Sequence, residues 1–437
     1  MAGLHLEADA GSHRDVERGH DRRSSGRILM PIRSIIASLA LLAGTAAVRA
    51  EGGTLVIVGG GLDPANDEIY GALLEARPAE TPAIAIIPAA SGESGTSARA
   101  ATAALTRHGA RPEDIVTIRL AVVDDPATPS IDEASWAGNA HNPAEIAAIE
   151  RAGAIWFLGG DQARITATLL EQDGSDTPML AAIRRRLAAG AVVGGTSAGA
   201  AIMSEGMINR GDTLGALIGE EAGEPLEIAR GLGFLSGALV DQHFGQRARL
   251  GRLAAALTDP VQPERLGFGI DEDTALVVHL GDGRAQVVGN GYLTVLDARA
   301  ARRLPGRRIA IEGLTLGLAA AGDRIDLAQG AITPAAVRKP TQGREYAEHP
   351  LPGGGGMAYG DQSLAVVVGE GLLDNAAATA IERHSFAGSA GVTYRFTETA
   401  VSRGWWGRDA RGRARYTLEG IAFGITPITV EIRKGTE

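Results

Sequence analysis

The sequence predicts an α/β fold, with a mainly parallel sheet covered by helices on both faces and a small β-rich module after it. From residue 51 onward, short and nearly continuous apolar runs alternate with stretches of helical pattern. Gly and small polar residues follow directly after these runs, and beyond residue 267 the runs are joined by short turns. Uninterrupted apolar strands separated by helices are typical of parallel strands that are buried on both faces.

Five apolar runs are the expected strands of this sheet. They lie at 54–58, 83–88, 115–120, 154–158 and 191–193. Helical patterns precede the last three of these runs, at about 98–108, after Asn142-Pro143 and at 180–187. Asn accepts hydrogen bonds from the free N–H groups of a first helical turn, and Pro fits that turn, so Asn142-Pro143 is a good helix start.

Later in the chain the expected elements are strands with short turns. These runs lie at 268–279, 285–288 and 292–296, and further strand-like runs follow at 392–396, 414–418 and 428–432. The pattern becomes irregular from about residue 300. We therefore expect an αβα domain over residues 51–300 and a β-rich C-terminal extension of unknown role over residues 301–437.

The first fifty residues have the pattern of a targeting segment. Arg33 precedes an apolar run at 35–48, and Val48-Arg49-Ala50 is a small-residue cleavage pattern. A positive flank, a short apolar core and such an end predict a secretory signal peptide over residues 30–50. Residues 1–29 are then an upstream extension or follow a mis-assigned start. The alternative is a disordered tail before a buried helix. An exported product would be periplasmic or secreted, with no membrane attachment after cleavage.

Composition excludes several classes of site. The chain has no Cys, which excludes disulfides, Cys metal sites and thiol nucleophiles. The net charge is −10 and no polybasic stripe occurs, so we expect no nucleic-acid partner.

Ser197 is the candidate nucleophile. It lies in Gly195-Thr196-Ser197-Ala198-Gly199, which follows an apolar strand and precedes a helical stretch. A nucleophile elbow needs this context, because the Ser occupies a sharp turn in which Gly two residues away on either side avoids a clash. The alternative is a Gly-rich turn that cradles a phosphate.

His243 is the candidate base, in Asp241-Gln242-His243-Phe244 after an apolar segment. Ligands bind beyond the carboxyl ends of parallel strands, so this polar triplet is expected to face the same crevice as Ser197. A satisfied structural His is the alternative. A triad also needs a carboxylate to orient its His, and 271–273 offers three acids among which periodicity does not choose.

Two further groups are expected near the crevice. The N–H groups of Gly160 and Ala198 are candidates for an oxyanion hole, although Gly159-Gly160-Asp161-Gln162 is also a plain loop that caps the next helix with Asp161. Clustered arginines bind carboxylates through paired hydrogen bonds, and the alternative is a solvated charged face. This cluster consists of Arg247, Arg249 and Arg252.

Four blocks of the sequence carry a resemblance to a known family: 159–162, 194–200, 241–244 with the three arginines, and 269–272. In this order they resemble the cyanophycinases, which belong to a serine peptidase family shared with aspartyl dipeptidase. The resemblance covers about residues 52–296. It implies a three-layer αβα fold like that of class I glutamine amidotransferases, and a Ser197–His243–Glu272 triad. It also implies that the crevice surrounds the substrate with six side chains, those of Gln162, Asp241, Gln242, Arg247, Arg249 and Arg252. From the same resemblance, no metal or organic cofactor is expected.

The function implied is that of an exported serine-type exopeptidase that releases β-aspartyl-arginine dipeptides from cyanophycin through an acyl-enzyme. Alternatives are a dipeptidase on short aspartyl or isoaspartyl peptides and a non-catalytic envelope protein that binds peptides. Two features depart from the family, whose storage-granule enzymes are intracellular and whose compact members lack a long tail. That tail would bind substrate, mediate a homodimer or close over the cleft, and the sequence does not choose.

Overall fold

The computed structural model describes residues 52–350, 356–357 and 363–431. The expected upstream extension at 1–29 and the signal peptide at 30–50 lie outside these residues. The described residues belong to a single unit that spans residues 49–437. None of the helices in the described ranges is long and apolar enough to cross a bilayer.

The first sheet has nine strands in the order β16-β15-β11-β10-β1-β5-β4-β2-β3. Five of them run parallel, and β1 pairs with β5 in register from Thr54↔Val192 to Val58↔Thr196. The apolar runs of the sequence form these strands because both faces of the sheet are buried. The parallel strands are β1 (Thr54–Val58), β2 (Ala83–Ile87), β3 (Ile115–Thr117), β4 (Ala152–Phe157) and β5 (Val192–Thr196).

The other strands of this sheet are antiparallel, so the sheet is mixed and has a parallel core, whereas the sequence predicted a mainly parallel one. The physical reason is connection length. Only residues 280–283 separate β10 from β11, and a short turn reverses the chain, whereas parallel neighbours need a long crossover. The antiparallel strands are β10 (Thr274–His279), β11 (Arg284–Gly289), β15 (Arg324–Ile325) and β16 (Ile332–Thr333).

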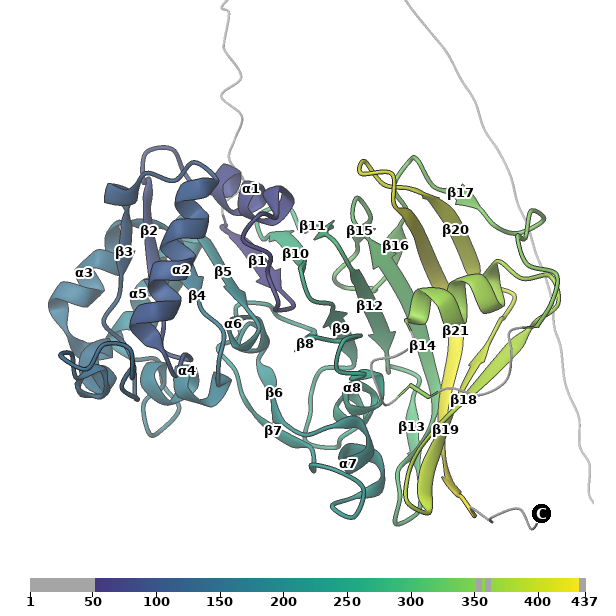
Figure 1. Ribbon diagram of the computed structural model, residues 1–437. Coiled ribbons are helices and arrows are strands. Elements are labelled where there is room, and N and C mark those ends of the chain that lie inside the picture. Colours follow the sequence, from purple (N-terminus) through teal and green to yellow (C-terminus); the bar gives the residue numbers. More distant parts are fainter. Residues whose placement is uncertain (1–51, 351–355, 358–362, 432–437) are drawn as a thin grey trace, which may run out of the picture. The chain divides into compact units, whose positions relative to one another are not determined.

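Helices cover both faces of the parallel core (Figure 1). One face carries α1 (Asp67–Ala76) and α2 (Ser94–Arg107). The opposite face carries α3 (Pro143–Arg151), α4 (Gln162–Leu169) and α5 (Pro178–Ala188). The expected start of α3 is confirmed, because the side chain of Asn142 accepts a hydrogen bond from Ala144 N and Pro143 occupies the first turn. Short 3₁₀ helices lie at η1 (Pro112–Asp114) and η2 (Glu133–His141).

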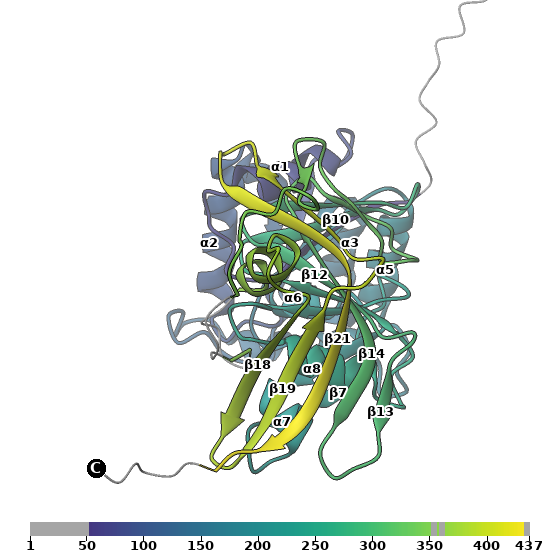
Figure 2. The ribbon, with the colours of Figure 1, turned by 90° about the vertical axis from the view of Figure 1, so that its right-hand side faces the viewer.

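The second sheet has ten strands and contains most of the C-terminal part of the chain. Its path is β17-β20-β21-β14-β12-β9-β8, with β13 on β14 and β18-β19 on β21. Figure 2 shows β14, β18, β19 and β21 as long neighbouring strands. The strands are β8 (Leu239–Gln242), β9 (Leu266–Ile270), β12 (Tyr292–Asp297), β13 (Arg302–Leu304), β14 (Ala310–Ala320), β17 (Lys339–Pro340), β18 (Ala380–Ala387), β19 (Ala390–Thr397), β20 (Arg403–Arg408) and β21 (Ala414–Thr429).

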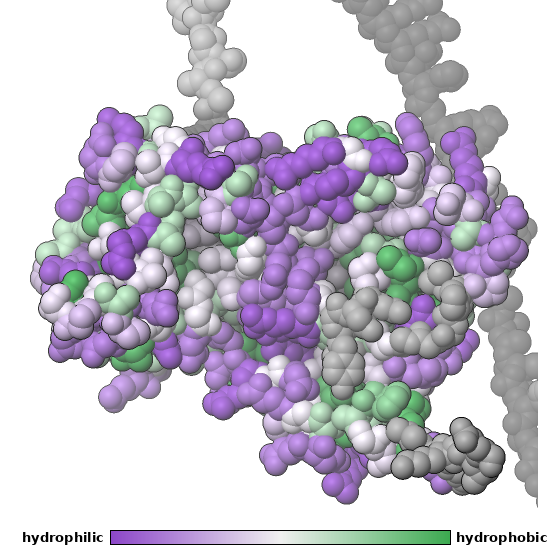
Figure 3. All heavy atoms as spheres, viewed as in Figure 1, coloured by the Kyte–Doolittle hydropathy of each residue, from purple (hydrophilic) through white to green (hydrophobic). Residues whose placement is uncertain are grey.

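The expected β-rich C-terminal region is thus present. Strands from both sides of residue 300 pair within one sheet, as β12 does with β14, and the division of domains at residue 300 stays a prediction. Helices α7 (Thr213–Ile218) and α8 (Leu250–Leu257) pack with this sheet, as does the π-helix η3 (Ala365–Leu373). On the face shown in Figure 3, hydrophilic residues predominate and hydrophobic residues form separate patches.

The chain crosses from one sheet to the other at 271–273. The sequence predicted one strand over 268–279, but the structure divides it into β9, which pairs with β8 and β12, and β10, which pairs with β1 and β11. Asp273 marks the crossing with a φ of 53°. Because β8 runs parallel to β9 and both end here, residue 243 and the acidic triplet are brought to the same place.

Candidate active site

Ser197 occupies a sharp turn between β5 and the short helix α6 (Ala198–Ala201). Its φ is 55° and its ψ is −110°, a backbone conformation that non-Gly residues rarely adopt. The flanking glycines are required by space. A Cβ at Gly195 would lie 2.6 Å from the carbonyl oxygen of Gly199, and one at Gly199 would lie 2.6 Å from that of Phe157. This is the geometry expected of a nucleophile elbow.

A continuous chain of hydrogen bonds joins the three residues expected to form the triad. Ser197 Oγ lies 2.7 Å from His243 Nε2, and His243 Nδ1 lies 2.6 Å from Glu272 Oε1. The second contact resolves the choice that the acidic triplet left open, because of its three acids only Glu272 pairs with the imidazole among the described residues. In this arrangement Nδ1–H donates to the carboxylate and Nε2 is free to accept the Ser197 proton.

The surroundings of His243 favour its neutral form. Burial lowers the pKa of His243 most, and the charges of Arg247 and Arg249 lower it further. The hydrogen bond and charge of Glu272 act in the opposite direction, but the net pKa lies below the usual value of His. A neutral imidazole at pH 7 is the form that can take a proton from a serine hydroxyl.

The turn after β1 supports both partners of Ser197. His243 N donates to Gly59 O at 2.6 Å, and Asp273 N donates to Gly60 O at 2.8 Å. A Cβ at Gly60 would lie 2.3 Å from His243 Cε1, and one at Gly61 would lie 2.7 Å from Glu272 Oε2. The sequence showed Gly59-Gly60-Gly61 at a strand end, but not that two of its glycines leave space for the imidazole and the carboxylate.

The two candidate oxyanion donors follow the ends of the neighbouring strands β5 and β4. Ala198 follows Ser197 directly at the head of α6, and the β4–α4 turn approaches Ser197 from the next strand. A Cβ at Gly159 would lie 3.3 Å from Ser197 Cβ. Gly160 has a φ of 141° and packs so closely on Ala90 O that an added Cβ would lie 2.1 Å away. The oxyanion role of the Gly160 and Ala198 N–H groups stays a prediction.

Ser197 and His243 line a pocket of about 760 Å³. Most of the residues expected to bind substrate line it: Gln162, Gln242, Arg247, Arg249 and Arg252. The Oε1 atom of Gln242 is buried and has no hydrogen-bond partner among the described residues. Gln162 is partly engaged, since its Nε2 donates to Ile208 O at 3.0 Å and also contacts Asn209 O.

Asp241 is the expected substrate-binding residue that does not line the pocket. It is 1% exposed and forms a two-point ion pair with Arg252, at 2.6 and 3.0 Å. Burial acts to raise the pKa of Asp241, but the charges of Arg252 and Arg249 and the hydrogen bonds outweigh it and keep this pKa below its usual value. The Asp241 carboxylate is therefore already occupied by protein groups, and its role toward substrate stays a prediction.

The three arginines of the cluster differ in their freedom. Arg252 is 3% exposed and also donates to Gly211 O at 2.6 Å. Arg249 donates to Gln242 O at 2.6 Å, and burial lowers its pKa to about 10 against the opposing effect of Asp241. Arg247 is exposed, and its side chain makes no hydrogen bond or ion pair within the described ranges. Arg247 is thus the arginine most open to a ligand carboxylate.

One wall of the pocket was missed by sequence reasoning. It is the two-stranded hairpin of β6 (Gly206–Arg210) and β7 (Glu227–Arg230), with the loop between them, and it contributes Asn209, Arg210 and Glu224. No sequence pattern connects these residues to Ser197. Within the described residues no group of three His, Asp or Glu side chains is arranged to hold a metal ion.

Comparison with known proteins finds one matching family model and several similar proteins. Residues 131–287 match the sequence model described as peptidase family S51. A cyanophycinase of Trichormus variabilis is 37% identical over 200 residues, which are 44% of this chain and 63% of that protein. A cyanophycinase of Geminocystis herdmanii is 40% identical over 184 residues, 40% of this chain and 63% of that protein. The chain therefore spans less than two thirds of the length of these relatives.

Two solved structures are also similar. A peptidase from an acI-B1 Actinobacterium matches with a TM-score of 0.45 and 24% identity, over 64% of this chain and 98% of that one. A putative peptidase E protein from Listeria monocytogenes EGD-e matches with a TM-score of 0.33 and 14% identity, over 55% of this chain and 100% of that one. By the match of residues 131–287 and the likeness to cyanophycinases, this chain is similar to the serine-type peptidases of family S51.

Proposed function

We propose that this protein is an exported serine-type exopeptidase that hydrolyses cyanophycin to β-aspartyl-arginine dipeptides. The observation that carries the proposal is the hydrogen-bonded chain Ser197–His243–Glu272 at the wall of an arginine-lined pocket. The similarity to cyanophycinases supports the choice of substrate. A fold of the class I glutamine amidotransferase type and a periplasmic or secreted location belong to the same proposal.

The first half of the reaction forms an acyl-enzyme. His243 Nε2 removes the proton from Ser197 Oγ as the oxygen attacks the carbonyl carbon of the aspartyl bond. The carbonyl oxygen becomes negatively charged and is bound by the N–H groups of Gly160 and Ala198. Glu272 holds the imidazole through Nδ1–H and stabilises its positive charge. His243 then gives the proton to the leaving nitrogen, the C–N bond breaks, and the acyl group stays on Ser197.

The second half regenerates the serine. A water molecule gives one proton to His243 Nε2 and attacks the ester carbonyl, and the same oxyanion donors bind the second tetrahedral intermediate. When this intermediate collapses, His243 returns the proton to Ser197 Oγ and the acid product leaves. The lowered pKa of His243 supports this cycle at neutral pH, because the imidazole starts each half-reaction uncharged.

The pocket offers complementary charges to a dipeptide with both an acid and a guanidinium group. Arg247 is free to bind an aspartyl carboxylate, with Arg249 beside it. Asp241 is occupied by Arg252, and Asp161, which also lines the pocket, accepts from Ala163 N and lies near Arg164. The acid that would meet a substrate arginine is therefore Glu224, whose exposed side chain lines the same pocket. A volume of about 760 Å³ lies within the range of small-molecule sites and accommodates a dipeptide unit.

The test is product analysis by mass spectrometry after incubating the purified full-length chain with insoluble cyanophycin. Wild type, Ser197→Ala and the exposed-serine control Ser135→Ala are compared. Release of aspartyl-arginine dipeptide by wild type and Ser135→Ala, but not by Ser197→Ala, is expected. Release by all three would show that Ser197 is not the nucleophile. No release by any would reject cyanophycin, and cleavage of short isoaspartyl peptides by the same set would then favour a dipeptidase.

A further inference from the structure

The turn between β20 and β21 carries three arginines around one aspartate, at 409–415. We refer to Asp409, Arg411, Arg413 and Arg415 as the arginine turn. Asp409 Oδ2 accepts from Arg413 Nε at 2.8 Å and from Arg415 Nε at 3.2 Å, and its Oδ1 accepts from the backbone N–H groups of Arg411 and Arg413. Burial acts to raise the pKa of Asp409, but these hydrogen bonds and charges keep it below its usual value. The carboxylate therefore stays charged and fixes the direction of the side chains.

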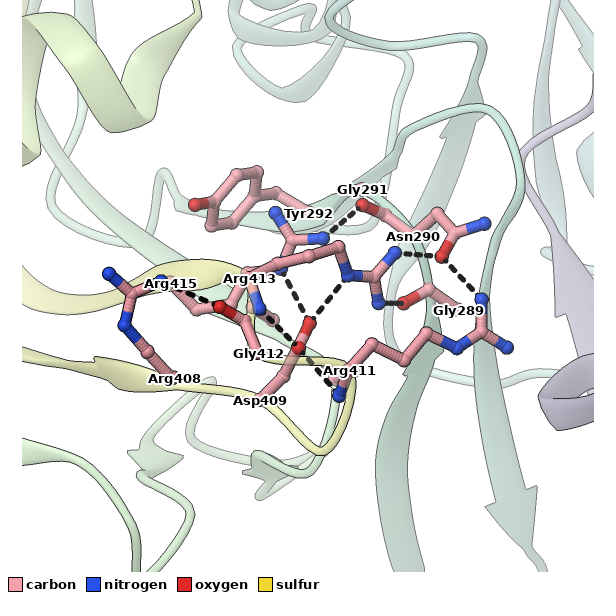
Figure 4. A network of polar contacts seen from close by, with 12 residues as sticks. Gly289, Asn290, Gly291, Tyr292, Arg408, Asp409, Arg411, Gly412, Arg413 and Arg415 are labelled. Atoms are coloured by element: carbon pink, nitrogen blue, oxygen red, sulfur yellow. Dashed lines mark hydrogen bonds and ion pairs between the residues drawn. The ribbon is translucent and has the colours of Figure 1, made fainter.

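The arginine turn contacts the turn that joins β11 to β12 (Figure 4). Asn290 receives most of these contacts: its Oδ1 accepts from Arg411 Nη1 at 3.1 Å and from Arg413 Nη1, and its backbone O accepts from Arg415 Nη2 at 2.7 Å. Arg415 also lies over the ring of Tyr292 at 5.5 Å. The C-terminal part of the chain thus binds the turn that leads from the first sheet to the second, through charge-assisted hydrogen bonds.

The other side of this turn holds the loop that carries Glu272. Asn290 N donates to Asp273 O at 2.7 Å, and Asn290 Nδ2 donates to Asp273 Oδ2. Gly291 N donates to Thr274 Oγ1 at 2.7 Å, and Tyr292 N donates to Asp271 Oδ2 at 3.0 Å. The residues on both sides of Glu272 are therefore bound to 290–292.

Asn290 connects the two sets of contacts. An amide side chain has an oxygen that only accepts and a nitrogen that only donates. Because the arginines of the turn donate to Asn290 Oδ1, Asn290 Nδ2 must face Asp273. A flipped amide would lose the hydrogen bonds on both sides. The arginines thereby fix the orientation in which Asn290 binds the loop.

Glu272 depends on this loop for its position. Its side chain is 37% exposed, so close packing does not fix it. Its carboxylate binds His243, and its backbone N donates to Gln246 Oε1 at 2.9 Å. An exposed side chain with one strong partner keeps its geometry only if its backbone is held, because its free rotamers otherwise compete with that contact.

We propose that the arginine turn is a positioning element for Glu272, acting through Asn290 and Asp273 on the loop 271–274. This gives the C-terminal region a role in the reaction without contact with substrate. The inference rests on the proposed function in one respect, which is that Ser197, His243 and Glu272 act as a triad.

The test compares Arg413→Ala with Arg395→Ala. Arg395 lies on β19 of the same sheet, pairs with exposed Glu382 and does not touch 289–292. For Arg413→Ala we expect kcat to fall about 10- to 100-fold, because small displacements of catalytic groups have such effects, with KM changed less than about twofold. Arg395→Ala should match wild type in both, and Arg413→Lys should recover part of kcat.

The pH profile separates positioning from a general loss of structure. The contact with Glu272 raises the pKa of His243, so loosening it should lower that pKa further. The acidic limb of the kcat/KM profile in Arg413→Ala should therefore move to lower pH, in the same direction as in Glu272→Gln and by less. An unchanged kcat, or a fall in kcat with an unmoved limb, would overturn the proposal.

A second variant keeps the test valid if Arg413→Ala does not fold. Asn290→Asp leaves the oxygen that faces the arginines and replaces the donor to Asp273 by an acceptor, so the same shift of the limb is expected. The downfield NMR signal of His243 Nδ1–H should weaken in both variants and persist in Arg395→Ala. Retention of that signal in Arg413→Ala and Asn290→Asp would reject the positioning role. Absence of Ser197-dependent hydrolysis in wild type would reject the proposed function, and the NMR test would still apply in that case.

Discussion

Two regions of this molecule place arginines around a single aspartate, and they use them in opposite ways. Beside the pocket, Asp241 lies with Arg249 and Arg252, and the pair with Arg252 is almost completely buried. In the arginine turn, the side chain of Asp409 is 6% exposed, and those of Arg411, Arg413 and Arg415 are 38%, 29% and 12% exposed. The first cluster stabilises the wall of the pocket. The second donates hydrogen bonds to the side chain and backbone of Asn290, in a turn that is distant in the sequence.

The comparison shows that the spacing of arginines does not reveal their partner. Arg247, Arg249 and Arg252 follow one another closely in the sequence, yet only Arg247 is free for a ligand, while Arg252 neutralises a buried carboxylate. Arg411, Arg413 and Arg415 follow one another just as closely, and all three contact 290–292 or Glu68. What differs is the exposure of the arginines that surround each aspartate, and the groups that lie within reach of those arginines.

The largest effect expected from this comparison is on stability. Asp241→Ala would leave Arg252 buried without a counter-charge, which typically costs about 3–5 kcal/mol of unfolding free energy. Asp409→Ala should cost only about 1 kcal/mol, because water can solvate its partly exposed arginines. Urea unfolding of both variants measures the difference.

A double variant sharpens this prediction. Asp241→Ala combined with Arg252→Met removes both charges, and replacing a buried pair by apolar groups is often nearly neutral. The double variant should therefore recover most of the stability lost in Asp241→Ala. Equal losses in Asp241→Ala and Asp409→Ala, or no recovery in the double variant, would contradict the contrast between the two clusters.

Sequence reasoning was most informative about the first sheet. The apolar runs at 54–58, 83–88 and 154–158 correspond closely to β1, β2 and β4, because strands buried on both faces need uninterrupted apolar residues. The direction of later strands was not predictable, since an apolar run has the same composition in a parallel or an antiparallel pair. The break at 271–273 was hidden for a related reason: β9 and β10 are equally apolar and belong to different sheets only through their partners.

At the candidate site, local sequence motifs identified residues that the fold brings together. Contacts between residues that are distant in the sequence could not be predicted from such motifs. Ser197 and His243 lie at strand ends, and the chain's topology places strand ends side by side. Glu272 needed the family resemblance, because its neighbours Asp271 and Asp273 are the same type of residue. Glu224 and Asn290 carry no local signal, since each acts through partners that only the folded chain supplies.

A smaller effect is expected on substrate binding by the arginines beside the pocket. Arg247 has no protein partner in the described part of the chain, so Arg247→Ala should raise KM about tenfold, the loss of one charged hydrogen bond, and leave kcat little changed. Arg249→Ala also removes a contact to Gln242 O and a charge beside Asp241, so it should lower stability as well. Steady-state kinetics and thermal melts of the two variants separate these roles. If Arg247→Ala changed kcat and left KM at its wild-type value, the assignment of Arg247 to ground-state binding would be wrong.

The smallest effect is expected at Glu224, because an exposed charge interacts weakly with a charged ligand. Glu224→Gln keeps the size of the side chain and removes its charge, so it should lower kcat/KM for β-aspartyl-arginine by only about threefold, as for other exposed ion pairs. With β-aspartyl-leucine, which has no guanidinium group, wild type and variant should not differ. Glu220 provides the matched control, because it is also an exposed acid in the connection between β6 and β7 but does not line the pocket. Raising the salt concentration should reduce the preference of wild type for the arginine peptide, and Glu224→Gln should respond less. A loss that is equal for both peptides would mean that Glu224 shapes the wall of the pocket and does not recognise the guanidinium group.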